Sequence, residues 1–157
     1  MNDFQSTCSW CNLSEEDKKW QLFENGSWFV FLANEQDYIG RCMLVCKRHC
    51  GALSDLTAQE WTDFKQAVDR IEACLNASLG ADLCNWSCLM NSFYKSETPD
   101  PHLHIHVRPR CKQPVLLNGN AYPDAEFGHH YDPKKRNVLQ EEDRMALLQH
   151  IKAHLSL

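Results

Sequence analysis

The stretch Pro101-His-Leu-His-Ile-His-Val-Arg-Pro109 decides how the rest of the sequence is interpreted, because histidine and aliphatic residues alternate strictly along it. A period of two predicts a β-strand on which His102, His104 and His106 point to one face and the aliphatic residues to the other. Side chains on one face lie about 6.6 Å apart along a strand, too far for all three imidazoles to bind one metal ion. We therefore expect neighbouring histidines to have different roles, one on a metal and the next facing a substrate.

A polar, solvated sheet face is the simpler interpretation of these histidines, and it is the common one for a single histidine. The aliphatic row behind them and the prolines at both ends favour a chemical role instead. Imidazole is partly neutral at pH 7, and its phosphorus adduct is a good leaving group, so it suits nucleophilic attack on phosphorus.

A second chemical signal is Cys8-Ser-Trp-Cys11. The C-x-x-C pattern indicates either two metal ligands or a thiol redox pair. A redox pair usually sits where a strand enters a helix, and the flanking residues show no such pattern. Zinc needs two further ligands, and because the sequence has no second C-x-x-C, His49 and His102 are the candidates. Cys46 and Cys50, which flank His49, are alternative ligands, and a reduced pair without metal is the simplest alternative.

Apolar runs bounded by turn-forming residues predict the other strands. Asn25-Gly26 is a two-residue turn signal that joins antiparallel strands, so the runs on its two sides are expected to form a hairpin. A later apolar run is expected to lie at the centre of the sheet. The predicted strands are residues 20–24, 28–32 and 41–46 and the central strand 84–90, followed by a loop over 91–101.

Two main helices are expected. Thr57-Ala-Gln-Glu60 is a capping box, and an apolar stripe at spacings of three and four follows it as far as Gly80, which ends the helix. A second helix is expected over 139–155, because acidic residues fill its first turn and basic residues lie near its end. Residues 111–137 are expected to form mainly loop. These elements predict an α+β domain with a mostly antiparallel sheet of about five strands.

Composition limits the class of protein. The 157 residues contain no repeat or linker, so one domain is expected over 1–157. The nine Cys are an odd number and too few for a disulfide scaffold. Residues 1–6 lack the pattern of a signal peptide and no long apolar run is present, so we expect a cytoplasmic protein with no membrane span and reduced or metal-bound thiols. The net charge of −5 argues against a broad nucleic-acid surface.

The histidine row resembles the histidine triad (HIT) motif, His-φ-His-φ-His-φ-φ, in which φ is an apolar residue. Gly40-Arg-Cys-Met-Leu-Val-Cys-Lys-Arg-His49 is similar to the glycine-led strand of that family, which ends in Lys-Arg-His. The resemblance covers residues 8–110, with 111–157 as a C-terminal extension. It implies a HIT-like fold of the zinc-containing branch, similar to the diadenosine polyphosphate hydrolases.

The resemblance also implies roles for particular residues. His104 would be the nucleophile that attacks the α-phosphate of a nucleotide, and His106 would contact the phosphate and stabilise the developing charge. His102 would bind a structural Zn²⁺ ion together with Cys8, Cys11 and His49.

Several positions depart from the family pattern. Arg41 stands where the family commonly has histidine, and Arg108 stands where the motif is usually apolar. Glu97-Thr-Pro-Asp100 replaces the stretch before the triad, and Ala33 occupies the place of a ribose-binding Asp, so that Asn34 or Asp37 would have to substitute. The residues implied to bind substrate are Asn91, Thr98, Arg41, Arg108, Asn34, Phe29 and Phe31.

The leading hypothesis is therefore a hydrolase that acts on a small nucleotide, such as a dinucleoside polyphosphate or a nucleoside phosphoramidate, through a covalent nucleotidyl-histidine. A nucleotidyltransferase shares the same first step. The alternative is a non-catalytic, zinc-stabilised nucleotide-binding module. A zinc finger that binds nucleic acid is weaker, because no H-x₃₋₅-H pair lies near the C-x-x-C. The resemblance also implies a homodimer, for which Trp61 or the C-terminal segment offers an interface, although both also suit the core.

Overall fold

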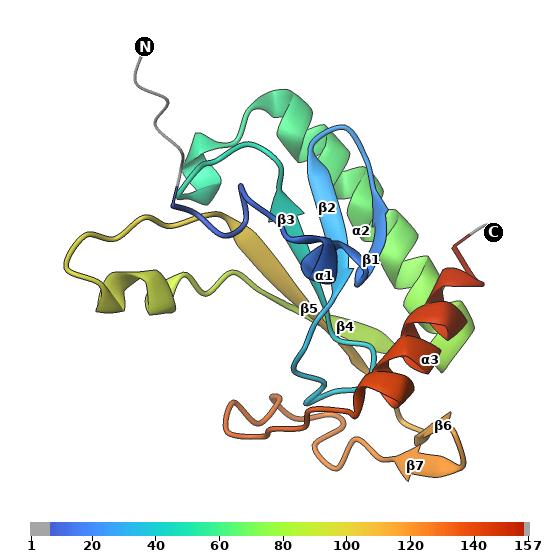
Figure 1. The fold of residues 1–157 in the computed structure, drawn as a ribbon. Helices are drawn as coiled ribbons and strands as arrows, with labels where there is room; N and C mark the ends of the chain where they lie inside the picture. The colour runs from blue at the N-terminus through green and yellow to red at the C-terminus, as the bar shows by residue number, and fades with distance from the viewer. Residues whose placement is uncertain (1–6, 156–157) are drawn as a thin grey trace.

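The strands form a five-stranded antiparallel sheet in the order β1-β2-β3-β5-β4, in a computed structural model that describes residues 7–155. Helix α2 runs along one face of this sheet, and α3 packs beside α2 and against β1 (Figure 1). The elements in chain order are α1 (Glu15–Lys18), β1 (Gln21–Glu24), β2 (Trp28–Leu32), β3 (Cys42–Cys46), the 3₁₀ turn η1 (Leu53–Asp55), α2 (Ala58–Leu79), β4 (Leu83–Ser87), the 3₁₀ turn η2 (Asn91–Lys95), β5 (His104–Arg110), the two short strands β6 (Val115–Leu117) and β7 (Asn120–Tyr122), and α3 (Glu141–Lys152).

The strand register separates two faces. Val30, Leu44 and Ile105 are cross-strand neighbours and are buried in the same core as Ile71 and Leu75 of α2. The next row along the strands, which points to the opposite face, consists of Phe31, Met43, His106 and Ser87. We call this opposite side of the sheet the triad face, because it also carries His104.

The start of α2 is tied to the end of β3. The Thr57 hydroxyl accepts a hydrogen bond from the amide of Glu60, and the Glu60 carboxylate accepts one from the amide of Thr57, so the predicted capping box is present. Arg48 donates to the same carboxylate over 2.7 Å and lowers the pKa of Glu60 to about 2. Gly80, with φ of 69°, ends the helix as expected. These contacts fix the segment that carries His49.

The glycine before β3 is required by its surroundings. Gly40 has φ of 94°, and a Cβ atom there would meet the side chains of Leu79 and Pro109. The chain therefore turns tightly at Gly40, and Arg41 follows it at the entrance to β3.

Three expectations about the elements are wrong in detail. The run predicted as a central strand forms β4, which lies at the edge of the sheet. Residues 111–137, expected to form mainly loop, also contain the small β6–β7 hairpin. The last helix ends at Lys152, so residues 153–155 are outside it. The predicted class is nevertheless confirmed: an α+β, HIT-like arrangement of five antiparallel strands and two main helices.

Within residues 7–155, no helix combines the length and the apolar character needed to cross a lipid bilayer. The expectation that residues 1–6 hold no signal sequence concerns a part of the chain outside the described residues.

Candidate active site and metal centre

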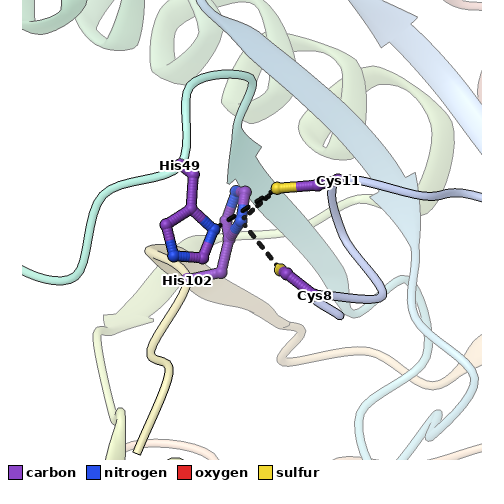
Figure 2. A group of neighbouring side chains, drawn as sticks. All are labelled: Cys8, Cys11, His49 and His102. Atoms are coloured by element: carbon purple, nitrogen blue, oxygen red, sulfur yellow. Dashed lines mark hydrogen bonds between the residues drawn. The ribbon is translucent and has the colours of Figure 1, made fainter. Parts of the chain in front are cut away.

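Four predicted metal ligands lie together at one end of the triad face (Figure 2). Cys8 and Cys11 come from the N-terminal loop, His49 from the segment after β3 and His102 from the residue pair before β5. Their ligand atoms all lie within 4.8 Å of one another. Cys8 Sγ is 3.3 Å from His102 Nδ1, Cys11 Sγ is 3.3 Å from His49 Nδ1, and Cys11 Sγ is 3.6 Å from His102 Nδ1.

These separations match those expected around a tetrahedral zinc ion. Zn–S bonds of about 2.3 Å and Zn–N bonds of about 2.0–2.1 Å at tetrahedral angles place S and N about 3.6 Å apart. Two thiols and two imidazole nitrogens are also a donor set that zinc commonly takes in structural sites. The residues present therefore fit the metal.

The outer nitrogen of each histidine in the cluster has its own partner. His49 Nε2 lies 2.9 Å from the carboxylate of Asp100, and His102 Nε2 lies 2.6 Å from the backbone oxygen of Cys46. Since a carboxylate or a carbonyl accepts a hydrogen bond, each Nε2 carries the proton and each Nδ1 keeps its lone pair for a metal. Asp100 was not among the residues expected at the site.

The other two triad histidines lie outside this cluster, as the hypothesis of separate roles requires. His104 is 8% exposed, and its Nδ1 donates to the backbone oxygen of His102 over 3.0 Å. Its Nε2 is therefore the unprotonated nitrogen, which is the nucleophilic one. The ring of His106 lies 5.0 Å from that of His104 between centroids, at an angle of 84°. Burial, with Arg41 as the next cause, lowers the pKa of His106 to about 3.

The two arginines expected to bind substrate share one buried carboxylate. Arg41 Nη1 is 3.2 Å and Arg108 Nε is 2.9 Å from Asp37 Oδ2. The Arg108 guanidinium also lies over the ring of Tyr131, 4.3 Å from its centroid, so the C-terminal extension buries it. Two positive groups and one negative group leave one net positive charge beside His106.

A cavity of about 350 Å³ lies next to the triad histidines, on the side of β2. Phe31 and Asn34 line it, as the resemblance implied. Trp10 joins them and links the cavity to the triad, because its ring centroid is 6.1 Å from those of both Phe31 and His104. Trp10 lies inside the C-x-x-C loop, which was the available sequence signal for it. The full lining consists of Trp10, Glu16, Asp17, Trp20, Phe31, Leu32, Asn34, Met43 and Arg144.

Arg144 comes from α3 and was not expected at the site. Its guanidinium lies over the ring of Trp20, 3.7 Å from the centroid, and donates to Asn34 and to the backbone oxygen of Leu32. The C-terminal helix thereby supplies one wall of the cavity.

The remaining predicted substrate residues lie further from the triad. Phe29 shares the triad face with Phe31, 5.9 Å away between ring centroids, and does not line the cavity. Asn91 and Thr98 are exposed on the segment 88–103 between β4 and β5, which we call the arm (Figure 1). No hydrogen bond among the described residues joins either of them to a triad histidine. Their roles stay predictions. The arm instead brings Phe93 to His104, with ring centroids 5.8 Å apart.

A further cavity of about 390 Å³ lies between the β2–β3 connection and the C-terminal extension. None of the triad histidines lines it, and its buried carboxylates, Asp37 and Asp124, are already paired with arginines. No triad histidine lines either cavity, but Trp10 and Met43 of the smaller one are neighbours of His104 and His106, so the smaller cavity is the better candidate for a substrate.

Comparison with known proteins bears on the fold. By sequence, no family model and no curated protein matches the chain. By structure, it is similar to a hypothetical histidine triad nucleotide-binding protein from Sulfolobus tokodaii, with a TM-score of 0.66 and 16% identity over 95% of this chain and 92% of that one. A zinc-bound histidine triad family protein from Mycobacterium smegmatis gives a TM-score of 0.62 at 19% identity, covering 96% and 94% of the two chains. A uridylyltransferase gives 0.66 at 18% identity, covering 95% of this chain and 45% of its own.

The sheet, the alternating histidines on β5 and these similarities define the chain as a protein with the histidine triad fold. The fold that the motif resemblance implied is thereby confirmed.

Proposed function

We propose that the chain is a histidine triad hydrolase or transferase that attacks the α-phosphate of a small nucleotide, such as a dinucleoside polyphosphate or a nucleoside phosphoramidate. The observation that carries this proposal is the position of Trp10, which lines the 350 Å³ cavity and whose ring lies 6.1 Å from that of His104 between centroids. The unprotonated Nε2 of His104 belongs to a ring that packs against Trp10, and Trp10 is a wall of that cavity. The aromatic walls Trp10 and Phe31 suit a nucleobase, and the volume is that of a small-ligand site.

The reaction proposed has two displacements. In the first, His104 Nε2 forms a bond to the α-phosphorus, and the bond between phosphorus and the leaving group breaks, with the electron pair going to the leaving atom. His106 donates a hydrogen bond to the phosphate or to the leaving atom and so reduces the developing charge. In the second, water or another acceptor attacks the same phosphorus and the P–N bond breaks, which restores neutral His104 and releases the nucleotide.

We propose that Cys8, Cys11, His49 and His102 bind one structural Zn²⁺ ion. The tetrahedral spacing of their ligand atoms supports this, as does the zinc-bound protein of the same fold. When bound, the ion would cross-link the N-terminal loop to the segment after β3 and the segment before β5, at one end of the triad face, and would supply no chemical step. Cys42, Cys74 and Cys111 are free, buried thiols, which supports the cytoplasmic location that we also propose.

The experiment is to incubate the protein with a panel of dinucleoside polyphosphates and nucleoside phosphoramidates, and to measure turnover and covalent adducts by mass spectrometry. We expect a nucleotidyl adduct on His104 and no adduct or turnover in His104→Ala. His129→Ala is the matched control, because His129 is exposed and its ring is outside the site. A folded His104→Ala variant that keeps full hydrolysis contradicts the proposal, and nucleotide binding without turnover in the unaltered protein supports the non-catalytic alternative.

A further inference from the structure

The guanidinium of Arg41 contacts His106 and is largely shielded from solvent. Its Nη2 lies 3.2 Å from Nδ1 of His106, and its Nη1 lies 3.2 Å from the buried carboxylate of Asp37. The side chain of Arg41 is 12% exposed, and its Nε is buried with no partner among the described residues. Little of the guanidinium therefore remains available to a substrate.

The contact with His106 has only one consistent proton arrangement. A guanidinium has N–H donors and no acceptor, so Nδ1 of His106 must accept and cannot carry a proton. The proton of the neutral ring is then on Nε2. For His104 the opposite holds, because its Nδ1 faces a carbonyl oxygen and must donate. Two adjacent imidazoles are thus held in opposite tautomers, one with a lone pair at Nε2 and the other with an N–H at Nε2.

The carboxylate of Asp37 anchors the guanidinium of Arg41. The carboxylate is 2% exposed and accepts from Arg41 and Arg108, so the guanidinium is anchored without any contribution from a ligand. The arrangement is therefore already formed in the free protein.

We propose that Arg41 is a positioning residue that fixes His106 as a permanent Nε2–H donor, opposite in tautomer to the nucleophile His104, and that it is not primarily a phosphate-binding residue. The inference rests on the proposed function, because the donor acts on the phosphate or on its leaving atom. The groups that face His106 agree with it: Arg41 from the β2–β3 connection and Arg108 and His104 from β5 all disfavour an imidazolium there, in addition to burial.

The test uses Arg41→Met, which keeps side-chain bulk and removes the donors, and Arg41→Lys, which keeps a positive donor of similar reach. Arg136→Met is the matched control, since Arg136 is exposed and donates only to backbone oxygens of its own loop. Long-range ¹H–¹⁵N NMR on the substrate-free protein reports the protonation state of each imidazole nitrogen. We expect His106 to remain the Nε2–H form down to pH 5 in the unaltered protein and in Arg136→Met. In Arg41→Met, where no guanidinium faces Nδ1, we expect part of the His106 population to shift to the Nδ1–H tautomer, which has no proton on Nε2.

Kinetics give an independent readout. A lost donor is expected to lower kcat of Arg41→Met by about 10²-fold with KM unchanged, and Arg41→Lys is expected to recover part of this loss. A raised KM with unchanged kcat and unchanged His106 resonances overturns the inference and makes Arg41 a substrate-binding residue. The NMR result needs no substrate, so it stands or falls separately from the proposed function, which is tested by the adduct on His104.

Discussion

Two histidines of the same strand face differ chemically because their Nδ1 atoms have different neighbours. His104 donates to a main-chain oxygen, whereas His106 faces a guanidinium and lies among positive groups. Burial is the largest cause of the lowered pKa of His106, because a buried imidazole disfavours the charged form, and the positive groups add to it. The residue type is therefore less informative about function than the atom that each ring nitrogen faces.

The low pKa of His106 predicts how stability depends on pH. The unfolded chain has an ordinary histidine pKa near 6.5, while the folded chain holds the pKa of His106 at about 3. Between these values the unfolded state binds the extra proton, so the free energy of unfolding falls as the pH drops from about 6.5 towards 3, by at most about 1.4 kcal/mol per pH unit from this one group. Urea denaturation at several pH values measures this slope.

In His106→Gln that contribution is absent, so the fall in stability between pH 6.5 and 4 should be shallower than in the unaltered protein. His129→Gln, which removes an exposed imidazole, should leave the slope unchanged. If the free energy of unfolding falls equally steeply with pH in all three proteins, the low pKa of His106 is contradicted.

The four candidate metal ligands could be predicted from the sequence alone. The C-x-x-C pattern and the shortage of other paired cysteines led to His49 and His102, and the structure brings these side chains together. Asp100 and Arg144 were missed because each meets the site only through folding, across 51 and 110 residues of chain to His49 and Asn34. No local pattern encodes such a contact.

At the level of elements, the N-terminal loop that carries Cys8 to Cys11 has little regular structure of its own. A single turn, in which the Cys11 amide donates to the Cys8 oxygen, shapes it, and the four-residue helix α1 follows. Neither makes a strand pair with the sheet. The proposed zinc ion would therefore add a cross-link to the contacts of Trp10 with Phe31 and His104, which also hold this loop against the sheet.

Removing the metal should loosen this loop and lower the melting temperature. Metal at a thousandfold excess over Kd stabilises a folded state by about 4 kcal/mol, which for a chain of this size corresponds to about 10 °C. We expect elemental analysis to find about one zinc ion per chain in the unaltered protein and in Cys88→Ser, and almost none in Cys11→Ser. A strong chelator should lower the melting temperature of the first two only.

Cys88 is a suitable control, because it is a half-buried free thiol outside the cluster. Metal-free protein that melts at the same temperature with and without added zinc would argue against the site.

Element prediction succeeded where local chemistry sets the outcome and failed where distant pairing does. The Thr57 capping box and the hairpin signal at Asn25-Gly26 need only neighbouring residues, and both the box and the hairpin formed, although three residues, 25–27, join the strands and Gly26 lacks the positive φ of a two-residue turn. The apolar residues of β4 led to the prediction of a central strand, but β4 lies at the edge of the sheet. Its Trp86 is covered by Phe64 of α2, with ring centroids 5.9 Å apart, and not by a second neighbouring strand. The Asn118-Gly119 turn, with φ of 48° and 79°, was a readable signal for the β6–β7 hairpin that the loop-like composition of 111–137 obscured.

On the scale of the whole molecule, the β4 edge is the surface that best suits the proposed homodimer. Its outer side has no strand partner among the described residues, and Leu83 on it is 45% exposed. On the other face of the sheet, Trp86 of β4 contacts Phe64 of α2, and Phe64 contacts Trp61, which is 43% exposed, with ring centroids 5.9 and 6.0 Å apart. An unpaired strand edge beside exposed apolar side chains favours pairing with a second copy.

Sedimentation velocity tests this surface. We expect a dimer at micromolar concentration for the unaltered protein and a shift to monomer for Leu83→Asp, because a buried, unpaired carboxylate disfavours the interface. Leu116→Asp places the same charge on β6, where Leu116 is 77% exposed, and should remain dimeric. A monomeric unaltered protein, or a dimeric Leu83→Asp, would exclude an interface at β4.

The cavity beside His104 also has a consequence for the order of assembly. One wall, Trp10, comes from the N-terminal loop and another, Arg144, from α3, while His104, the proposed nucleophile, lies on a strand between them. During synthesis on the ribosome, all five strands of the sheet emerge before α3 is complete. The nascent chain can therefore bring His104 and His106 together while the cavity is still open on one side, and under the proposed function the binding of a nucleotide would wait until α3 docks.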